Sequence, residues 1–81
     1  MALADELVSF INERLSQPRA EPVGPGDSLI DRGLLDSSAV MMIMSFVEER
    51  TGVQIPDEEV TPVNFETALA VAAMVGRLRS S

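Results

Sequence analysis

The chain contains no cysteine, histidine, lysine, tryptophan or tyrosine. The absence of cysteine excludes disulfides and a thiolate nucleophile. The absence of histidine removes the usual base of a serine hydrolase, and with cysteine also missing, only oxygen ligands are left for a metal. No Asp-x-Asp-x-Asp-Gly calcium loop is present either, so we predict neither a catalytic site nor a metal site.

Long hydrophobic runs are also absent. The sequence has no stretch of eighteen apolar residues and no basic segment leading into an apolar one. We therefore expect neither a membrane span nor a signal peptide, and a cytoplasmic protein is the default. The 81 residues have room for one hydrophobic core, so a single domain over 1–81 is predicted.

The charge is strongly acidic, with thirteen Asp and Glu residues against six arginines and a net charge of −7. This balance argues against nucleic acid as a partner, because binding to phosphate backbones requires clustered positive charge. It favours protein partners with basic docking surfaces, although solubility alone would explain the same charge. We expect the protein to be a monomer.

Apolar spacing predicts a first helix over 3–15 and a last helix over 67–78, since apolar residues recur in both at intervals that put them on one helical face. The expected buried stripe of the first helix is Leu3, Leu7, Phe10, Ile11 and Leu15. The expected stripe of the last helix is Leu69, Ala72, Val75 and Leu78.

A central helix is predicted over 37–50, with Asp36 as its N-cap and Gly52 as its left-handed C-cap. Ser37 takes the first helical position, where unpaired N–H groups and the helix dipole favour an anion such as a phosphate ester. The inward stripe is Val40, Ile43, Met44 and Val47, with Phe46 at its edge. A second face carries Ser37, Met41, Ser45 and Glu48.

The connections are predicted from prolines, glycines and isolated apolar residues. Residues 16–35 form a long loop whose second half is anchored to the core by Leu29, Ile30, Leu34 and Leu35. After the central helix, Val53 and Ile55 anchor an extended segment, and Asp57 is expected to cap a short helical turn over 58–60. The predicted fold is all-α, a small four-helix bundle of three longer helices and one short one with a long loop after the first.

Three segments carry a resemblance to a known family. They are Gly33-Leu34-Leu35-Asp36-Ser37, the pair Glu48-Glu49, and the run from Thr51 to Glu59 that contains Gly-Val-Gln-Ile-Pro. Together they resemble the acyl and peptidyl carrier proteins, whose mark is Asp-Ser-Leu at the start of the second helix. The resemblance covers about 3–78, with Ser38 standing where the family usually has leucine.

The resemblance implies a role for each part of this segment. Ser37 would receive a 4'-phosphopantetheine arm from coenzyme A through a phosphopantetheinyl transferase, and Asp36 would cap the helix and help the transferase engage. The arm would hold an acyl or aminoacyl group as a thioester, and the protein itself would not be an enzyme. The expected docking face for partners is Ser38, Met41, Met42, Glu48 and Glu49.

The resemblance also implies partners. An adenylating ligase or an acyltransferase would load the arm, and a downstream synthase or transferase would use the cargo, in polyketide or nonribosomal peptide biosynthesis. The Gly-Leu-Leu-Asp-Ser opening looks more like discrete aminoacyl carriers than fatty-acid carriers, which favours an adenylating ligase.

Two alternatives have a different function. Asp27-Ser28-Leu29 is also an Asp-Ser-Leu tripeptide, and with Gly26 it resembles the nucleophile block of a lipase and esterase family. A hydrolase using Ser28 would need a base such as histidine, which the chain lacks, so Asp27 and Ser28 are interpreted as turn formers. The second alternative is a helical interaction module that is never modified.

Overall fold

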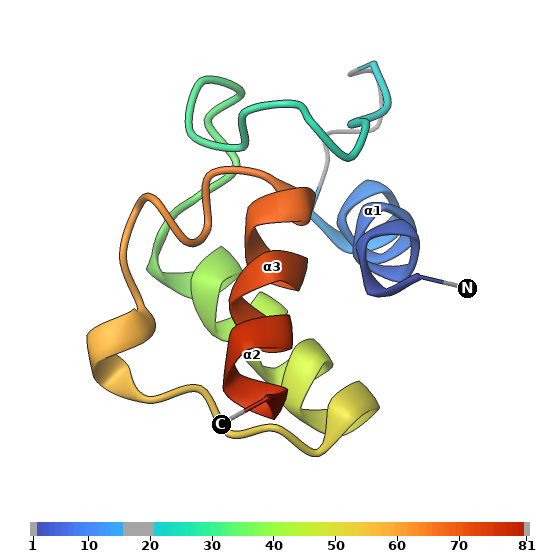
Figure 1. Ribbon diagram of the computed structural model, residues 1–81. Helices are drawn as coiled ribbons and strands as arrows, with labels where there is room; N and C mark the ends of the chain where they lie inside the picture. Colours follow the sequence, from blue (N-terminus) through green and yellow to red (C-terminus); the bar gives the residue numbers. More distant parts are fainter. Residues whose placement is uncertain (1, 16–20, 81) are drawn as a thin grey trace.

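The computed structural model describes residues 2–15 and 21–80, and within them the chain is all-helical, with no strand (Figure 1). The elements are α1 (Leu3–Arg14), α2 (Ser37–Thr51), the 3-10 turn η1 (Asp57–Glu59) and α3 (Ala68–Arg79). The three longer predicted helices are confirmed to within one residue at each end. The predicted fourth helix is only the single turn η1, so the bundle has three α-helices. None of the helices described is long and apolar enough to cross a membrane.

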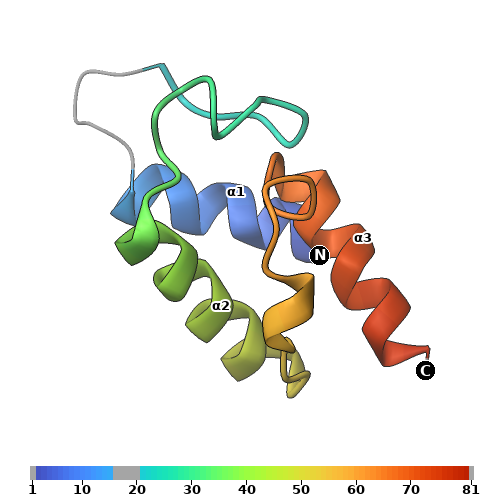
Figure 2. The same ribbon diagram turned by 90° about the vertical axis from the view of Figure 1, so that its left-hand side faces the viewer.

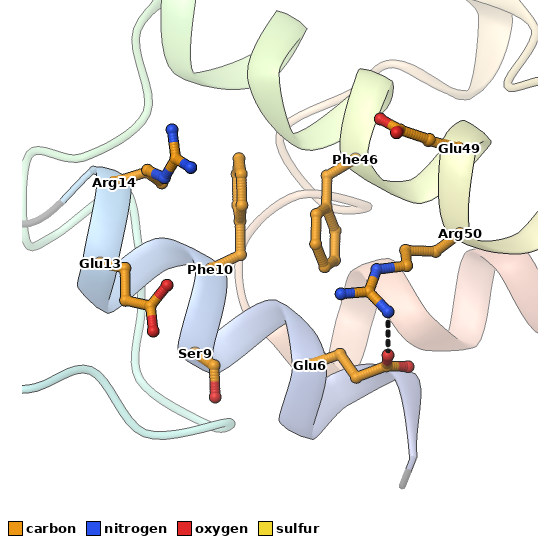
Figure 3. Close-up of a pocket in the computed structure, with 8 residues that line it drawn as sticks. All are labelled: Glu6, Ser9, Phe10, Glu13, Arg14, Phe46, Glu49 and Arg50. Carbon is orange, nitrogen blue, oxygen red and sulfur yellow. Dashed lines mark hydrogen bonds and ion pairs between the residues drawn. The ribbon is translucent and has the colours of Figure 1, made fainter.

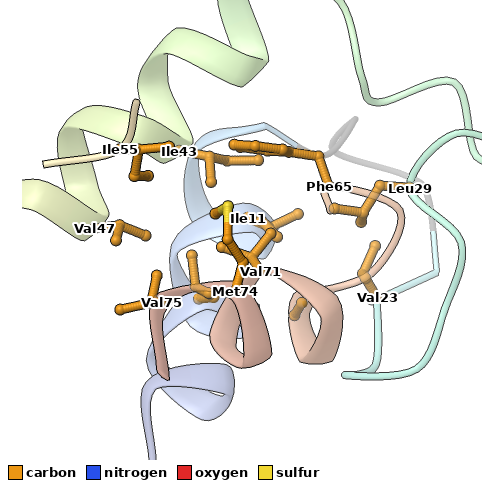
Figure 4. Close-up of a cluster of buried hydrophobic side chains, with 12 residues drawn as sticks. Ile11, Val23, Leu29, Ile43, Val47, Ile55, Phe65, Val71, Met74 and Val75 are labelled. Atoms are coloured by element: carbon orange, nitrogen blue, oxygen red, sulfur yellow. The ribbon is translucent and has the colours of Figure 1, made fainter. Parts of the chain in front are cut away.

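The helices enclose one hydrophobic core, and the connecting segments also contribute to it (Figure 4). Its buried members are Leu7, Ile11, Val23, Leu29, Ile43, Val47, Ile55, Phe65, Ala68, Val71, Met74 and Val75. Leu29 and Ile55 confirm the predicted anchors, and Val53, Leu34 and Leu35 pack partly buried against the cluster. Ile30 was a wrong prediction, because 45% of its surface is exposed.

The loop that leads into α2 crosses the end of the bundle where α3 begins (Figures 1 and 2). Two backbone hydrogen bonds fasten it there, from Leu29 N to Glu66 O at 2.7 Å and from Leu69 N to Pro25 O at 3.1 Å. The side chain of Asn12 in α1 holds the same loop through Val23, accepting from its N–H at 2.7 Å and donating to its carbonyl at 3.0 Å.

The predicted stripe of α3 was wrong at Leu69 and confirmed at Val75, and Leu78 packs partly buried against the core. Leu69 is 53% exposed, and the buried residues of the helix are Ala68, Val71, Met74 and Val75. The cause is the orientation of the helix, which turns Ala68 and not Leu69 towards the core. Its start agrees with the cap rule, because Thr67 Oγ1 accepts from Ala70 N at 2.9 Å.

The predicted cap at Asp57 was also wrong. The hydrogen bonds of η1 run from Glu59 N to Pro56 O and from Val60 N to Asp57 O, so the turn starts at the Pro56 carbonyl. Asp57 is therefore the first residue inside the turn, and no side chain caps it.

Candidate functional site

The first turn of α2 is built as the sequence predicts. Asp36 has an extended backbone, with φ −117° and ψ 179°, and its Oδ1 accepts from Ala39 N at 2.8 Å. Its carbonyl accepts from Val40 N at 3.0 Å. The N–H groups of Ser37 and Ser38 make no hydrogen bond within the described residues, and both side chains are exposed. An anion attached to Ser37 would meet two free donors and the positive end of the helix dipole.

An open groove of about 830 Å³ lies beside Ser37. Met41 and Met44 of α2 line it together with Val60, and Asp57 of η1 faces it as well. It continues into a smaller groove of about 360 Å³ through the shared residues Leu35, Val40 and Val60. An exposed hydroxyl at a helix N-terminus, next to a largely apolar groove, fits a phosphate-linked group with a long chain.

The residues expected to dock partners divide into two groups. Ser38, Met41, Met42 and Glu49 line one surface groove of about 440 Å³ on α2, and Met41 is 68% exposed. Glu48 lies apart from them, half-buried, and its Oε2 accepts from the backbone N–H of Ile55 at 3.1 Å. The structure therefore gives Glu48 a local structural contact that the sequence did not reveal.

Sequence reasoning missed an aromatic contact between α1 and α2 (Figure 3). The rings of Phe10 and Phe46 stack with centroids 4.4 Å apart and planes inclined by 25°. The guanidinium of Arg50 lies 5.2 Å from the Phe46 centroid and bonds Glu6 Oε1 at 3.1 Å. Both rings are only half-buried. One feature of the sequence could have indicated this contact: Phe46 lies at the edge of the apolar stripe of α2, where a side chain is only partly covered by the core.

No family model matches the sequence. A curated relative, the probable acyl carrier protein PigG of Serratia sp. (strain ATCC 39006), is 24% identical over 78 residues, which are 96% of this chain and 90% of that protein. A chain in the crystal structure of an FAD-dependent dehydrogenase is 30% identical with a TM-score of 0.79 over 88% of this chain and 100% of that one.

Two further similar structures are complexes of a ligase with a carrier protein. In the Bradyrhizobium japonicum glycine:[carrier protein] ligase complexed with glycylated carrier protein, the matched chain is 29% identical with a TM-score of 0.67, over 88% of this chain and 96% of that one. In the same ligase complexed with its cognate carrier protein and an analogue of glycyl adenylate, the matched chain is 29% identical with a TM-score of 0.69. The match covers 91% of this chain and 96% of that one. The 81 residues cover 96% of each matched chain, so the matched chains are short. They are therefore the carrier proteins of these complexes and not the ligase.

The chain is thus similar to an acyl carrier protein in sequence and to two carrier proteins in structure. This likeness indicates a carrier and not an enzyme.

Asp27 and Ser28, the alternative nucleophile segment, are turn formers in the structure. Asp27 Oδ2 accepts from Gly24 N at 2.8 Å, and Ser28 Oγ accepts from Asp31 N at 3.1 Å. The turn closes with a hydrogen bond from Leu34 N to Leu29 O at 2.9 Å, around Gly33 at φ 71°. Ser28 thus caps one isolated turn, with no imidazole anywhere in the chain to take its proton.

Proposed function

We propose that the chain is a carrier domain that is modified with phosphopantetheine at Ser37. The observation that carries this proposal is the exposed Ser37 hydroxyl at the first position of α2, beside the Asp36 cap and two free N–H groups. When attached, the group supplies a thiol on which an acyl or aminoacyl chain is held as a thioester. The chain's own part is to fix the attachment point at a helix N-terminus and to present it to a phosphopantetheinyl transferase.

We assign the cargo to the aminoacyl class, loaded by an adenylating ligase. The support is the likeness to carriers that are complexed with a glycine:[carrier protein] ligase, at 29% identity over nearly their whole length. The match to a chain in an FAD-dependent dehydrogenase structure suggests an enzyme of that kind as a downstream partner that acts on the carried group. Such reactions fit a cytoplasmic pathway of specialised metabolism, as in nonribosomal peptide or polyketide biosynthesis.

For partner recognition we propose the exposed surface of α2 next to the attachment point. Ser38, Met41, Met42 and Glu49 share one groove there, and the thioethers can adapt to partners of different shape. Asp36 would engage the transferase as well as cap the helix.

Intact mass after co-expression with a broad-specificity phosphopantetheinyl transferase tests the proposal. We expect the wild-type chain and Ser28→Ala to gain the mass of one phosphopantetheine, and Ser37→Ala to gain none while keeping its helix content. Mapping the modified peptide locates the group. Attachment at Ser28 or Ser38 would contradict the site, and no attachment to the wild-type chain would favour an unmodified interaction module.

A further inference from the structure

A groove between α1 and α2 is left unused by the attachment site. It has a volume of about 790 Å³, and the stacked rings of Phe10 and Phe46 line it (Figure 3). We call it the Phe10–Phe46 groove. It shares Phe10, Phe46 and Glu49 with the groove that holds Met41 and Met42, so the two form one continuous surface.

The use of aromatic residues here is unusual for this chain. Only three phenylalanines are present in the sequence, and one of them, Phe65, lies in the core with 1% exposure. The other two, Phe10 and Phe46, lie half-buried at the surface between the helices. Rigid aromatic rings that remain partly exposed are enriched in the centres of protein–protein interfaces.

The charges around the stack favour a cationic partner. Arg50 is paired with Glu6, which leaves Glu13 on α1 and Glu49 on α2 with no ion partner among the described residues. Arg14 is the one other cation on the groove, so the lining keeps a net negative charge. The net charge of the whole chain, −7, also attracts a cationic partner.

The surface is also well placed for a loading enzyme. Its α2 side starts at Ser38, the residue after the proposed attachment point, and continues to Glu49. At 1.5 Å per residue this distance along the helix is about 16 Å. A partner seated on the groove would therefore hold α2 along most of its length, with Ser37 at the end.

We propose that the adenylating ligase docks on α1 as well as α2, with apolar side chains on Phe10 and Phe46 and arginine or lysine side chains against Glu13 and Glu49. This inference rests on the proposed carrier function and names the surface and the chemistry of its loading partner. It adds Phe10 and Glu13 of α1 to the recognition surface of α2.

The test is binding of the phosphopantetheine-bearing protein to a purified glycine:[carrier protein] ligase, with Glu13→Arg compared with Asp5→Arg. Both residues are exposed on α1 and both variants make the same change of charge, but Asp5 does not line the groove. We expect Glu13→Arg to raise Kd by about tenfold at low salt and Asp5→Arg by less than about twofold. The difference should shrink in about 1 M salt, where charges are screened beyond about 3 Å.

A second measurement locates the interface directly. In 15N-labelled protein titrated with the ligase, amide shifts should include Phe10, Glu13, Phe46 and Glu49, whereas shifts confined to α2 and η1 would overturn the role of α1. Equal effects of Glu13→Arg and Asp5→Arg would also overturn it, because they would reflect net charge alone. Failure of the wild-type protein to bind would overturn the choice of partner. Intact mass before each titration shows whether the arm is present, so a failure of the carrier function itself would be recognised separately.

Discussion

The carboxylate of Glu48 accepts a hydrogen bond from the backbone N–H of Ile55 at 3.1 Å. Glu48 lies in the last turn of α2, and Ile55 is the buried anchor of the segment that follows it. The contact fixes the direction in which the chain leaves α2, together with Gly52 at φ 72° as the left-handed C-cap. Neighbouring glutamates in the sequence therefore have different tasks: Glu48 stabilises the fold, and Glu49 remains on the surface.

The first prediction separates these two glutamates. Glu48→Ala should lower the free energy of unfolding by about 1 kcal/mol or more, because it leaves the partly buried Ile55 N–H without an acceptor. Glu49→Ala makes the same change of charge at an exposed position and should cost less than about 0.5 kcal/mol. Urea denaturation of both variants measures the difference, and equal midpoints would show that the Ile55 contact contributes nothing.

The second prediction concerns the caps of α2 and α3. Asp36→Ala and Thr67→Ala each remove a side chain that accepts from the N–H three residues on, and each should cost about 1 kcal/mol. Only Asp36→Ala should also slow attachment of phosphopantetheine, since Asp36 adjoins Ser37 whereas Thr67 begins another helix. Thermal melts and the time course of modification by intact mass give the two results. A Thr67→Ala variant that is modified as slowly as Asp36→Ala would mean that stability alone governs the reaction.

A third prediction tests Met41 as a contact for the loading enzyme. Met41 is 68% exposed, so Met41→Ala should leave the melting temperature nearly unchanged, and alanine also favours the helix. If a partner buries this side chain, its loss should raise the Michaelis constant for loading by about tenfold, which corresponds to about 1.4 kcal/mol. Leu69→Ala is the matched control, because Leu69 is a similarly exposed apolar residue on α3. Loading kinetics with equal constants for Met41→Ala and the parent would exclude Met41 from the docking surface.

The fourth prediction concerns salt. Three ion pairs within the described residues lie near the surface: Arg32–Asp27, Arg50–Glu6 and Arg77–Glu59. Such pairs contribute little, whereas a net charge of −7 on a small domain opposes compaction. The melting temperature should rise between about 0.01 M and about 0.15 M salt, as the screening length falls from about 30 Å to about 8 Å. A melting temperature that falls or stays constant would show that the ion pairs outweigh the self-repulsion.

Local rules predicted the parts of the fold that depend on neighbouring residues. Asp36 caps α2 and Gly52 ends it as expected, because an N-cap and a left-handed C-cap depend on the chemistry of a few adjacent residues. The long helices follow from apolar spacing for the same reason. The candidate attachment site is local as well, since Ser37 follows its cap directly in the sequence.

Contacts between distant segments could not be predicted in this way. Periodicity shows that α3 has an apolar face, but Leu69 and Ala68 are adjacent, and only packing against α1 decides which one is buried. The pairing of Phe10 with Phe46, and that of Arg50 with Glu6, joins helices that are separated by more than twenty residues of chain. The sequence by itself therefore determined the α-helices, the two caps of α2 and the position of Ser37, because these depend on near neighbours. The tertiary structure alone decided the orientation of α3 and the aromatic groove, because both depend on how the helices pack together. It also decided the contact of Glu48, which depends on the path of the chain after α2.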